Sequence, residues 1–263
     1  MRELLSHPSA IEFTQGSIFE GLNSNQDGNY THAIIVTAKC DIANNKARNI
    51  LCLPIYKAED WINNHGDEIV FRRIEVKLEN KLKTELNSLK ISFETLNIYP
   101  LESIISLVEQ KQKKNEEIKM CIEMYYSKKC NYNLKFVADE RKNLVSTLIN
   151  NTENSIYFLE RIDFDELIEP HIIDLANPVS IPYCIAKKLS NGINRNKTNS
   201  SKNKQLIEQY LTIYKPEISY ISILKSPYIE HVLQKFSSYY SRIGTDDIEK
   251  ELRDILKEKL NEI

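Results

Sequence analysis

The sequence predicts an α+β protein in which a small, strongly bent β-barrel is interrupted by a helical insertion and followed by a pair of C-terminal helices. Three observations support this prediction. Short β-branched runs separated by Asn, Asp and Gly fill residues 16–55, as is typical of strands joined by turns. Leucines then recur at helical spacing over about residues 78–128. Two amphipathic segments with capping residues occupy 226–263.

Three strands are expected at the start of a barrel domain that spans residues 10–185. The β-branched run His32-Ala-Ile-Ile-Val-Thr37 is typical of a strand buried in a sheet. The segment 23–29 is rich in Asn, Asp and Gly and predicts a turn. The flanking strands are expected at Gly16–Phe19 and Asn49–Pro54, and a short helix at Ala58–Asn63.

The hydrophobic period changes after a further expected strand at Ile69–Val76. Leu78, Leu82 and Leu86 recur every four residues, so we predict a helical insertion at about 78–128. Strand-like patterns punctuated by prolines then return and complete the predicted barrel. These later strands are expected at 134–137, 155–159, 171–175 and 179–182.

The C-terminal third begins with a polar segment. Residues 186–204 contain several basic residues and no acid, which predicts an exposed basic loop. The region 205–263 is predicted to be helical. Ser226 and Pro227 can start one helix, and Thr245 can cap a second that has acids in its first turn.

Composition excludes several classes of protein. The formal net charge is -2, so no global field attracts nucleic acid or an anionic membrane. The five cysteines include no Cys-x-x-Cys pair, which indicates free thiols in a reducing cytoplasm. The N-terminus lacks the apolar stretch of a signal peptide, and no apolar run is long enough to cross a bilayer. We therefore expect a cytoplasmic protein without membrane contact.

No cofactor and no metal are expected. The histidines show no His-Glu-x-x-His pattern, and the sequence has no Gly-rich phosphate loop. Glu75-Val-Lys77, with Asp67 upstream, has the pattern of half a metal-dependent nuclease core. An exposed, alternating strand face explains the same residues and is the interpretation we prefer.

The N-terminal segment resembles a known family. Gly16-Ser-Ile-Phe19, a strand starting at His32 and Ile50-Leu-Cys-Leu-Pro-Ile55 follow one another with polar turns between them. This succession resembles the opening of the PemK/MazF-like, SH3-type barrels over about residues 16–56. The resemblance implies a barrel of that type.

The positions that the family uses for catalysis differ in this chain. The family's endoribonucleases carry an Arg before the second strand and a Thr or Ser after the third, whereas Thr31-His32 and Tyr56 occupy those places here. The resemblance therefore implies a barrel that binds rather than one that cleaves RNA. Lys39-Cys-Asp-Ile42, together with Ser226-Pro-Tyr and Arg242-Ile-Gly244, also resembles a group of large bacterial proteins with a Cys-Asp-(Ile/Leu) signature, and that likeness implies no activity.

The strand end Thr37-Ala-Lys-Cys-Asp41 is the first candidate site. In an enzyme, Cys40 would be a nucleophilic thiol whose pKa Lys39 lowers, with Thr37, Asp41 and His32 nearby. The alternative, which we prefer, is a small, buried Cys40 followed by an Asp41 that caps the next turn.

The basic loop is the second candidate. Lys187, Lys188, Arg195 and Lys197 could neutralise phosphates of a nucleic acid. The loop lacks interleaved aromatic residues, so base stacking is not indicated. The alternative is a solvated loop without a ligand.

The aromatic side chains near the C-terminus are the third candidate. Phe236, Tyr239 and Tyr240 widen the apolar face of the expected helix, as at interfaces with a partner or a second copy of the chain. The alternative is that this face packs against the protein's own core.

These features predict a non-catalytic binding or adaptor component of a bacterial conflict system, of the phage-defence or toxin–antitoxin type. Its partner would be another protein of the same operon. Nucleic-acid contact through residues 187–204 and formation of a homo-oligomer are both compatible with this prediction. The alternative is a diverged, MazF-like, metal-independent endoribonuclease that uses His32, Thr37, Lys39 and Asp41.

Overall fold

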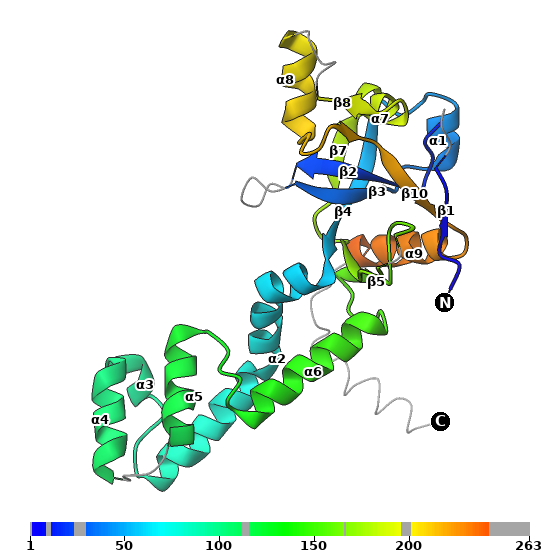
Figure 1. Cartoon of the computed structure of the whole chain (residues 1–263). Helices are drawn as coiled ribbons and strands as arrows, with labels where there is room; N and C mark the ends of the chain where they lie inside the picture. The colour runs from blue at the N-terminus through cyan, green and yellow to red at the C-terminus, as the bar shows by residue number, and fades with distance from the viewer. Residues whose placement is uncertain are drawn as a thin grey trace, which may run out of the picture.

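The protein consists of a sheet with helices on both faces and a helical arm that projects from it (Figure 1). The computed structural model describes residues 2–8, 12–23, 30–111, 116–165, 167–195 and 201–241. The described part confirms the predicted α+β class.

Eight antiparallel strands form the main sheet, in the order β1-β10-β2-β3-β4-β6-β5, with β7 pairing β4 beside β6. A separate two-stranded sheet joins β8 to β9. The bounds are β1 Leu5–Ser6, β2 Ser17–Asn23, β3 Tyr30–Ile35, β4 Asn49–Lys57, β5 Ile156–Leu159, β6 His171–Asp174, β7 Val179–Pro182, β8 Ile193–Asn194, β9 Glu217–Ile218 and β10 Tyr220–Leu224. All the strands predicted at the N-terminus and between 155 and 182 are present at these places.

The expected closed barrel is not formed by the described strands, because the main sheet is open. The strands at the two ends of this order, β1 and β5, pair with β10 and β6 and not with each other. The long strand β4 is shared between two partners: Asn49–Cys52 pair with β7, and Ile55–Lys57 pair with β6. A strand that divides its hydrogen bonds between two neighbours splits the sheet instead of closing it.

A bulge in β2 bends the centre of the sheet. Its register with β3 shifts between Phe19 and Leu22, and Gly21 lies there with a φ of +80°. A Cβ at Gly21 would stand 2.7 Å from the carbonyl oxygen of Thr212, so only glycine fits this close approach. The bulge in β2 therefore requires glycine at position 21.

The alternation of side chains along β3 divides the interior into two cores. Ala33 and Ile35 point into a core shared with α7 (Tyr183–Ser190), α8 (Ser201–Tyr210) and the β8–β9 pair. Ile34 points to the opposite face, where it packs in a core that α9 (Tyr228–Tyr240) covers through Ile229 and Val232. The sheet is thus buried on both faces, which explains why its strands are apolar runs.

The helical insertion is larger than the predicted 78–128. It runs from residue 58 to residue 149 as a hairpin of long helices with smaller ones at the tip. The bounds are α2 Ala58–Ser88, α3 Thr95–Ile98, α4 Leu101–Lys111, α5 Glu116–Ser127 and α6 Lys135–Ile149. At about 1.5 Å per residue, the 31 residues of α2 span about 46 Å, which makes the insertion an arm.

Two expected strands, Ile69–Val76 and 134–137, are wrong, because the first segment lies within α2 and the second is the N-cap and first turn of α6. The apolar residues from 70 to 86 continue one four-residue spacing, Val70, Ile74, Leu78, Leu82 and Leu86, and all five are buried. The short alternation within 69–76 therefore belonged to a longer helical face. The short helix expected at Ala58–Asn63 is the first turn and a half of α2.

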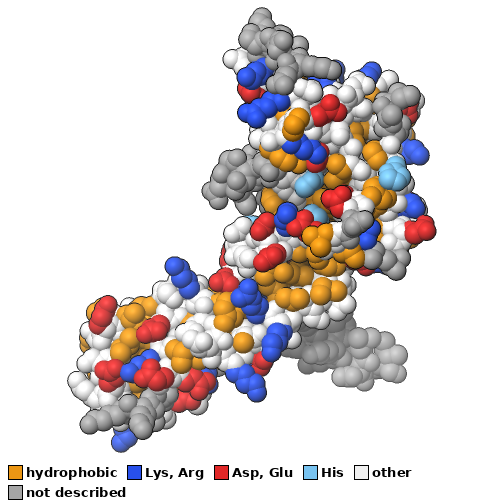
Figure 2. Space-filling view, in the orientation of Figure 1, with side chains coloured by type: hydrophobic (Ala, Val, Ile, Leu, Met, Phe, Trp, Pro, Cys, Tyr) orange, Lys and Arg blue, Asp and Glu red, His pale blue; other side chains and the backbone are white. Residues whose placement is uncertain are grey.

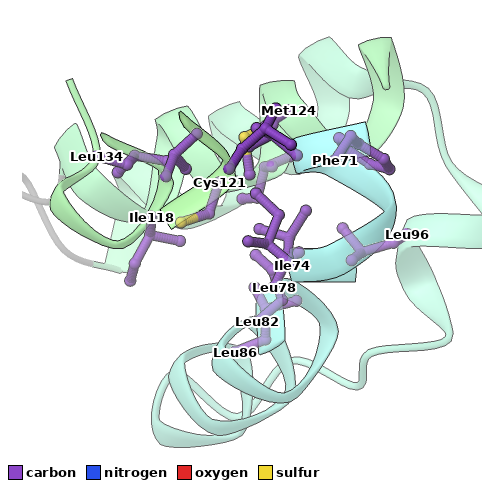
Figure 3. Close-up of a cluster of buried hydrophobic side chains, with 14 of the residues drawn as sticks. Phe71, Ile74, Leu78, Leu82, Leu86, Leu96, Ile118, Cys121, Met124 and Leu134 are labelled. Carbon is purple, nitrogen blue, oxygen red and sulfur yellow. The ribbon is translucent and has the colours of Figure 1, made fainter. Parts of the chain in front are cut away.

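The arm has a hydrophobic core of its own. Figure 3 shows Ile74, Leu78, Leu82 and Leu86 of α2 facing side chains of α5. The cluster reaches the sheet only through residues at the base of the arm, such as Ile156 and Ile172. Figure 2 shows hydrophobic side chains gathered where the sheet meets the arm.

Polar contacts fix the base of the arm. Arg73 pairs with Glu140 (3.2 Å) and Glu153 (2.6 Å), and so ties α2 to α6 and to the turn after it. Lys235 of α9 donates three hydrogen bonds to carbonyl oxygens of that turn and of the strand after it, on Asn151 (2.8 Å), Glu153 (2.6 Å) and Ile156 (2.8 Å). Burial lowers the pKa of Lys235 to about 8, and the charge of Glu153 opposes the shift.

The predicted basic loop 186–204 and helical region 205–263 are largely wrong as units. Lys187 and Lys188 lie in α7, Ile193–Asn194 form β8, and α8 starts at Ser201. The region after 205 contributes β10 to the main sheet, so it is part of the same domain. The first C-terminal helix is present as α9, and the predicted second helix, from Thr245, lies outside the described residues.

Candidate functional site

A groove between α1 (Lys39–Ala43) and α7 is the best candidate site, because two segments singled out in the sequence meet there. The groove has a volume of about 540 Å³ and lies at one end of the sheet, where Figure 1 places both helices. Residues from four separate segments line it: Glu12, Phe13, Thr14, Lys39, Ile42, Ala43, Asn45, Tyr183, Lys187 and Ile223.

Tyr183 links the two walls of the groove, α7 and the turn after α1, through hydrogen bonds. Its hydroxyl donates to Oδ1 of Asn45 (2.7 Å), and its backbone N–H donates to the carbonyl oxygen of Arg48 (3.0 Å). Asn45 holds the turn after α1 with a φ of 52°, a conformation that Asn tolerates better than most residues. Tyr183 and Lys187 are four residues apart on α7, so both face the groove.

The groove combines an apolar floor with positive charge. Phe13 and Ile42 are buried in the floor, and the ring of Phe13 lies 5.4 Å from that of Tyr183. Lys39 and Lys187 are both exposed, and neither forms an ion pair with a described residue. Two unpaired ammonium groups above an apolar floor suit a ligand that carries both carboxylates and apolar groups.

The segment Thr37 to Asp41 connects β3 to α1, and the thiol of Cys40 in it is exposed. Thr37 accepts a hydrogen bond from the backbone N–H of Leu51 (2.7 Å) and so extends the β3–β4 pairing. Cys40 is exposed, which corrects the preferred prediction that it is buried, and its Sγ lies 3.7 Å from Oδ1 of Asp41. Asp41 lies in the first turn of α1, and none of the described backbone N–H groups donates to its carboxylate, so the predicted Asx cap over the turn at Ile42–Asn45 is not formed.

His32 lies apart from the other residues predicted to act with it. It is near the start of β3, while Thr37 follows the end of that strand, about 16 Å away at about 3.3 Å per residue. His32 also lies on the same face as Ile34, opposite the core that floors the groove. The set His32, Thr37, Lys39 and Asp41 is therefore not assembled into one site.

His32 belongs instead to a polar cluster formed by β2, β3 and β6, with β4 lying between the last two. Its ring lies edge-to-face with that of His171 on β6, with centroids 6.0 Å apart. Glu20 on β2 is buried, and its Oε1 accepts from Tyr214 (2.9 Å) and Lys215 (2.6 Å). Figure 2 shows histidine and acidic side chains together on this side of the sheet.

Both histidines are held neutral. Burial, and secondly the neighbouring His171, lower the pKa of His32 to about 4, against the opposing charges of Glu20 and Asp163. Burial also lowers the pKa of His171. Nδ1 of His171 lies 2.7 Å from the carbonyl oxygen of Glu169, which can only accept, so Nδ1 carries the proton.

The four basic residues predicted to contact nucleic acid do not form one surface. Lys187 lines the α1–α7 groove, and Lys188 is half-buried on the same helix. Arg195 lines a different hollow of about 310 Å³, with Lys204 and Ile207. Lys197 lies outside the described residues.

The aromatic residues of α9 are used mainly inside the molecule. Phe236 packs against the core on the β3 face that holds Ile34. Tyr240 is 52% exposed, but its hydroxyl donates to the carbonyl oxygen of Ala176 (2.8 Å). Tyr239 is half-buried, with its ring 5.2 Å from that of Tyr240. These contacts favour the core-packing alternative over an interface.

Several residues of the site were missed by sequence reasoning. Tyr183 and Asn45 form the link between the walls, yet a Tyr after a strand and an Asn in a turn carry no distinctive signal. The four-residue spacing of Tyr183 and Lys187 could have indicated a shared helical face, had α7 been recognised.

Glu75, the residue of the nuclease-like pattern, lies on α2 and pairs with Lys128 (3.3 Å), which assigns it to the arm.

Comparisons with known proteins add no family to these observations. No family model matched this chain, and searches of curated proteins and of solved structures gave no match. None of the helices in the described ranges is both long and apolar enough to cross a membrane. Among the described residues, no three His, Cys, Asp or Glu side chains are grouped as metal ligands would be.

Proposed function

We propose that this protein is a non-catalytic binding component of a bacterial conflict system, of the phage-defence or toxin–antitoxin type. Its α1–α7 groove holds an acidic, partly apolar segment of a partner protein from the same operon. The observation that carries the proposal is the meeting of Lys39 and Lys187, from segments far apart in the sequence, over one apolar floor. The conflict-system setting rests on the resemblance of residues 16–56 to PemK/MazF-like proteins.

The chemistry of the groove favours a protein ligand over a nucleic acid. Among the described residues, two lysines line it, and Glu12 also lines it. A phosphate backbone carries a charge at every nucleotide and needs a longer run of cations than this. The ring of Phe13 is buried against the rings of Tyr183 and Tyr220, so it presents no free face on which a base could stack.

The separation of His32 from the groove supports a binding role. A metal-independent ribonuclease needs a base, an acid and a cationic group within hydrogen-bond reach of one phosphodiester. The residues first expected to supply them lie at two ends of β3. The endoribonuclease alternative would have to use His32 with Glu20 and Lys215, the cluster on the other face.

Reversing both groove charges, with Lys39→Glu and Lys187→Glu, should weaken partner binding by about one to two orders of magnitude, since each new glutamate would repel the carboxylate that the lysine attracted. The measurement is isothermal titration of the purified protein with the purified product of each flanking gene. A double variant on the arm, Lys135→Glu with Lys142→Glu, makes the same charge change on exposed residues of α6 and should bind as the wild type does.

Two results would contradict the proposal. One is a partner that binds the groove variant and the wild type equally. The other is cleavage of RNA by the purified wild-type protein that His32→Gln abolishes, which would establish the endoribonuclease alternative. RNA or DNA binding that is lost in the groove variant, with no protein partner bound, would reassign the groove to phosphate recognition.

A further inference from the structure

The connection between β5 and β6 exposes apolar side chains that the fold does not cover. Leu167 is 81% exposed, and Phe164 and Ile168 are 42% and 45% exposed. They alternate with the carboxylates of Asp163, Asp165 and Glu169, and the segment contains no base. We call the described residues Asp163–Asp165 and Leu167–Glu169 the acidic loop. Neighbouring exposed apolar groups beside charges are typical of a binding surface.

The acidic loop is anchored at both ends. Ile162 is buried before it, and its carbonyl oxygen accepts from Ser222. The carbonyl oxygen of Pro170, after it, accepts from the N–H of Ala58 (2.9 Å). Within the loop, the ring of Phe164 stacks on His7 at 4.0 Å. A loop held in this way loses little entropy when it binds.

The acidic loop and the α1–α7 groove are complementary in charge and in polarity. Glu169 is paired with Lys57 (2.8 Å), and Asp163 accepts from the backbone N–H of Asp165 (3.2 Å), so the loop offers the carboxylate of Asp165 beside Leu167 and Ile168. The groove offers two unpaired lysines above an apolar floor. The two surfaces lie on opposite faces of the sheet, since Ile162 belongs to the core with Ile34 and Ile42 to the core with Ile35. A loop cannot reach the groove of its own molecule across the sheet.

We propose that the acidic loop of one copy of this chain occupies the α1–α7 groove of a second copy. The contact joins two different surfaces, so a pair joined by one contact keeps one free groove and one free loop, and assembly continues into a ring or a chain. The proposal rests on the proposed function, because it assigns to the same groove a second ligand of the same chemistry. Self-assembly then competes with partner binding and keeps the groove closed until the partner is present.

The test is sedimentation of the full chain over a wide range of concentration. The wild type should self-associate, and Leu167→Glu or Lys187→Glu should each raise the dissociation constant at least about tenfold. Asp165→Lys should do the same alone, and the double variant with Lys187→Glu should regain most of the lost affinity, because the charge pair is restored in reverse. Val76→Glu alters an exposed apolar residue of the arm (69% exposed) and should leave self-association unchanged.

The outcomes separate this inference from the proposed function. A wild type that remains monomeric, or one that self-associates equally in Leu167→Glu and Lys187→Glu, overturns the self-docking contact. If partner binding still depends on Lys39 and Lys187 in that case, the proposed function stands without it. If self-association needs both surfaces and the partner ignores the groove, the self-docking stands and the proposed function fails. Leu167→Glu should also bind the partner more tightly than the wild type, since no loop competes.

Discussion

Replacing Lys235 by Met should lower the free energy of unfolding by about 2 to 4 kcal/mol, because three carbonyl oxygens lose a charged donor together. The ammonium group of Lys235 joins α9 to the turn between α6 and β5, where the arm meets the sheet. At pH 7 that group is protonated, since its pKa of about 8 lies above the pH of the experiment. Met keeps the length of the aliphatic chain, so the change isolates the donors.

Urea-induced unfolding at pH 7, followed by circular dichroism, measures this loss. Lys142→Met is the matched control: Lys142 is exposed on α6, and its replacement should change the unfolding free energy by less than about 0.5 kcal/mol. An equal effect of the two substitutions would show that the three hydrogen bonds of Lys235 contribute nothing beyond those of a surface lysine.

Lowering the pH from 7 to 4.5 should cost the wild type roughly 2 to 3 kcal/mol more stability than it costs His32→Gln. The folded protein holds the pKa of His32 at about 4, below the ordinary value of 6.5, because the ring is buried and His171 adjoins it. Between these two values the unfolded chain binds a proton at this position and the folded chain does not. The contribution of neutral His32 to the free energy of unfolding is therefore fully present above pH 6.5 and is lost as the pH falls toward 4.

The comparison uses urea midpoints at pH 7 and pH 4.5 for both proteins, so that carboxylates common to both cancel. His7→Gln replaces an exposed histidine and controls for the removal of one imidazole. If the wild type and His32→Gln lose the same stability on acidification, His32 is not buried in its neutral form. His171 shifts in the same direction and should leave a smaller acid sensitivity in His32→Gln.

The strands of the sheet could be predicted because their signal is local. Ala33–Ile35 and Ile50–Leu53 are apolar on both faces, as strands covered on both sides must be. Closure of the sheet could not be predicted, because it depends on how β4 divides its hydrogen bonds between β6 and β7. Those partners are more than a hundred residues further along the chain, beyond the arm.

The arm shows how a short window misassigns a long helix. Within Ile69–Val76 the apolar residues alternate as in a strand, and only the continuation through Leu78, Leu82 and Leu86 reveals a single buried helical face. The isolated four-residue segment 134–137 gave the same error. There, Leu134 and Val137 are followed by Leu144 and Leu148, which bury the same side of α6.

The candidate site could be predicted in parts but not as a whole. Lys39 and Lys187 were each singled out from their own segment, the one for a strand end and the other for a basic run. Their meeting depends on the antiparallel pairing of β4 with β7, which brings the start of α7 beside the turn after α1. The exposure of Cys40 was missed because free cysteines are commonly buried.

Hydrogen–deuterium exchange of the protein, with and without its bound partner, tests the central claim most directly. The claim predicts slower amide exchange in Lys39–Ala43 and Tyr183–Ser190, the two walls of the groove, with little change in the arm helices α3 and α4. Protection confined to the arm, with the exchange of α1 and α7 unchanged, would contradict the claim that the groove holds the partner.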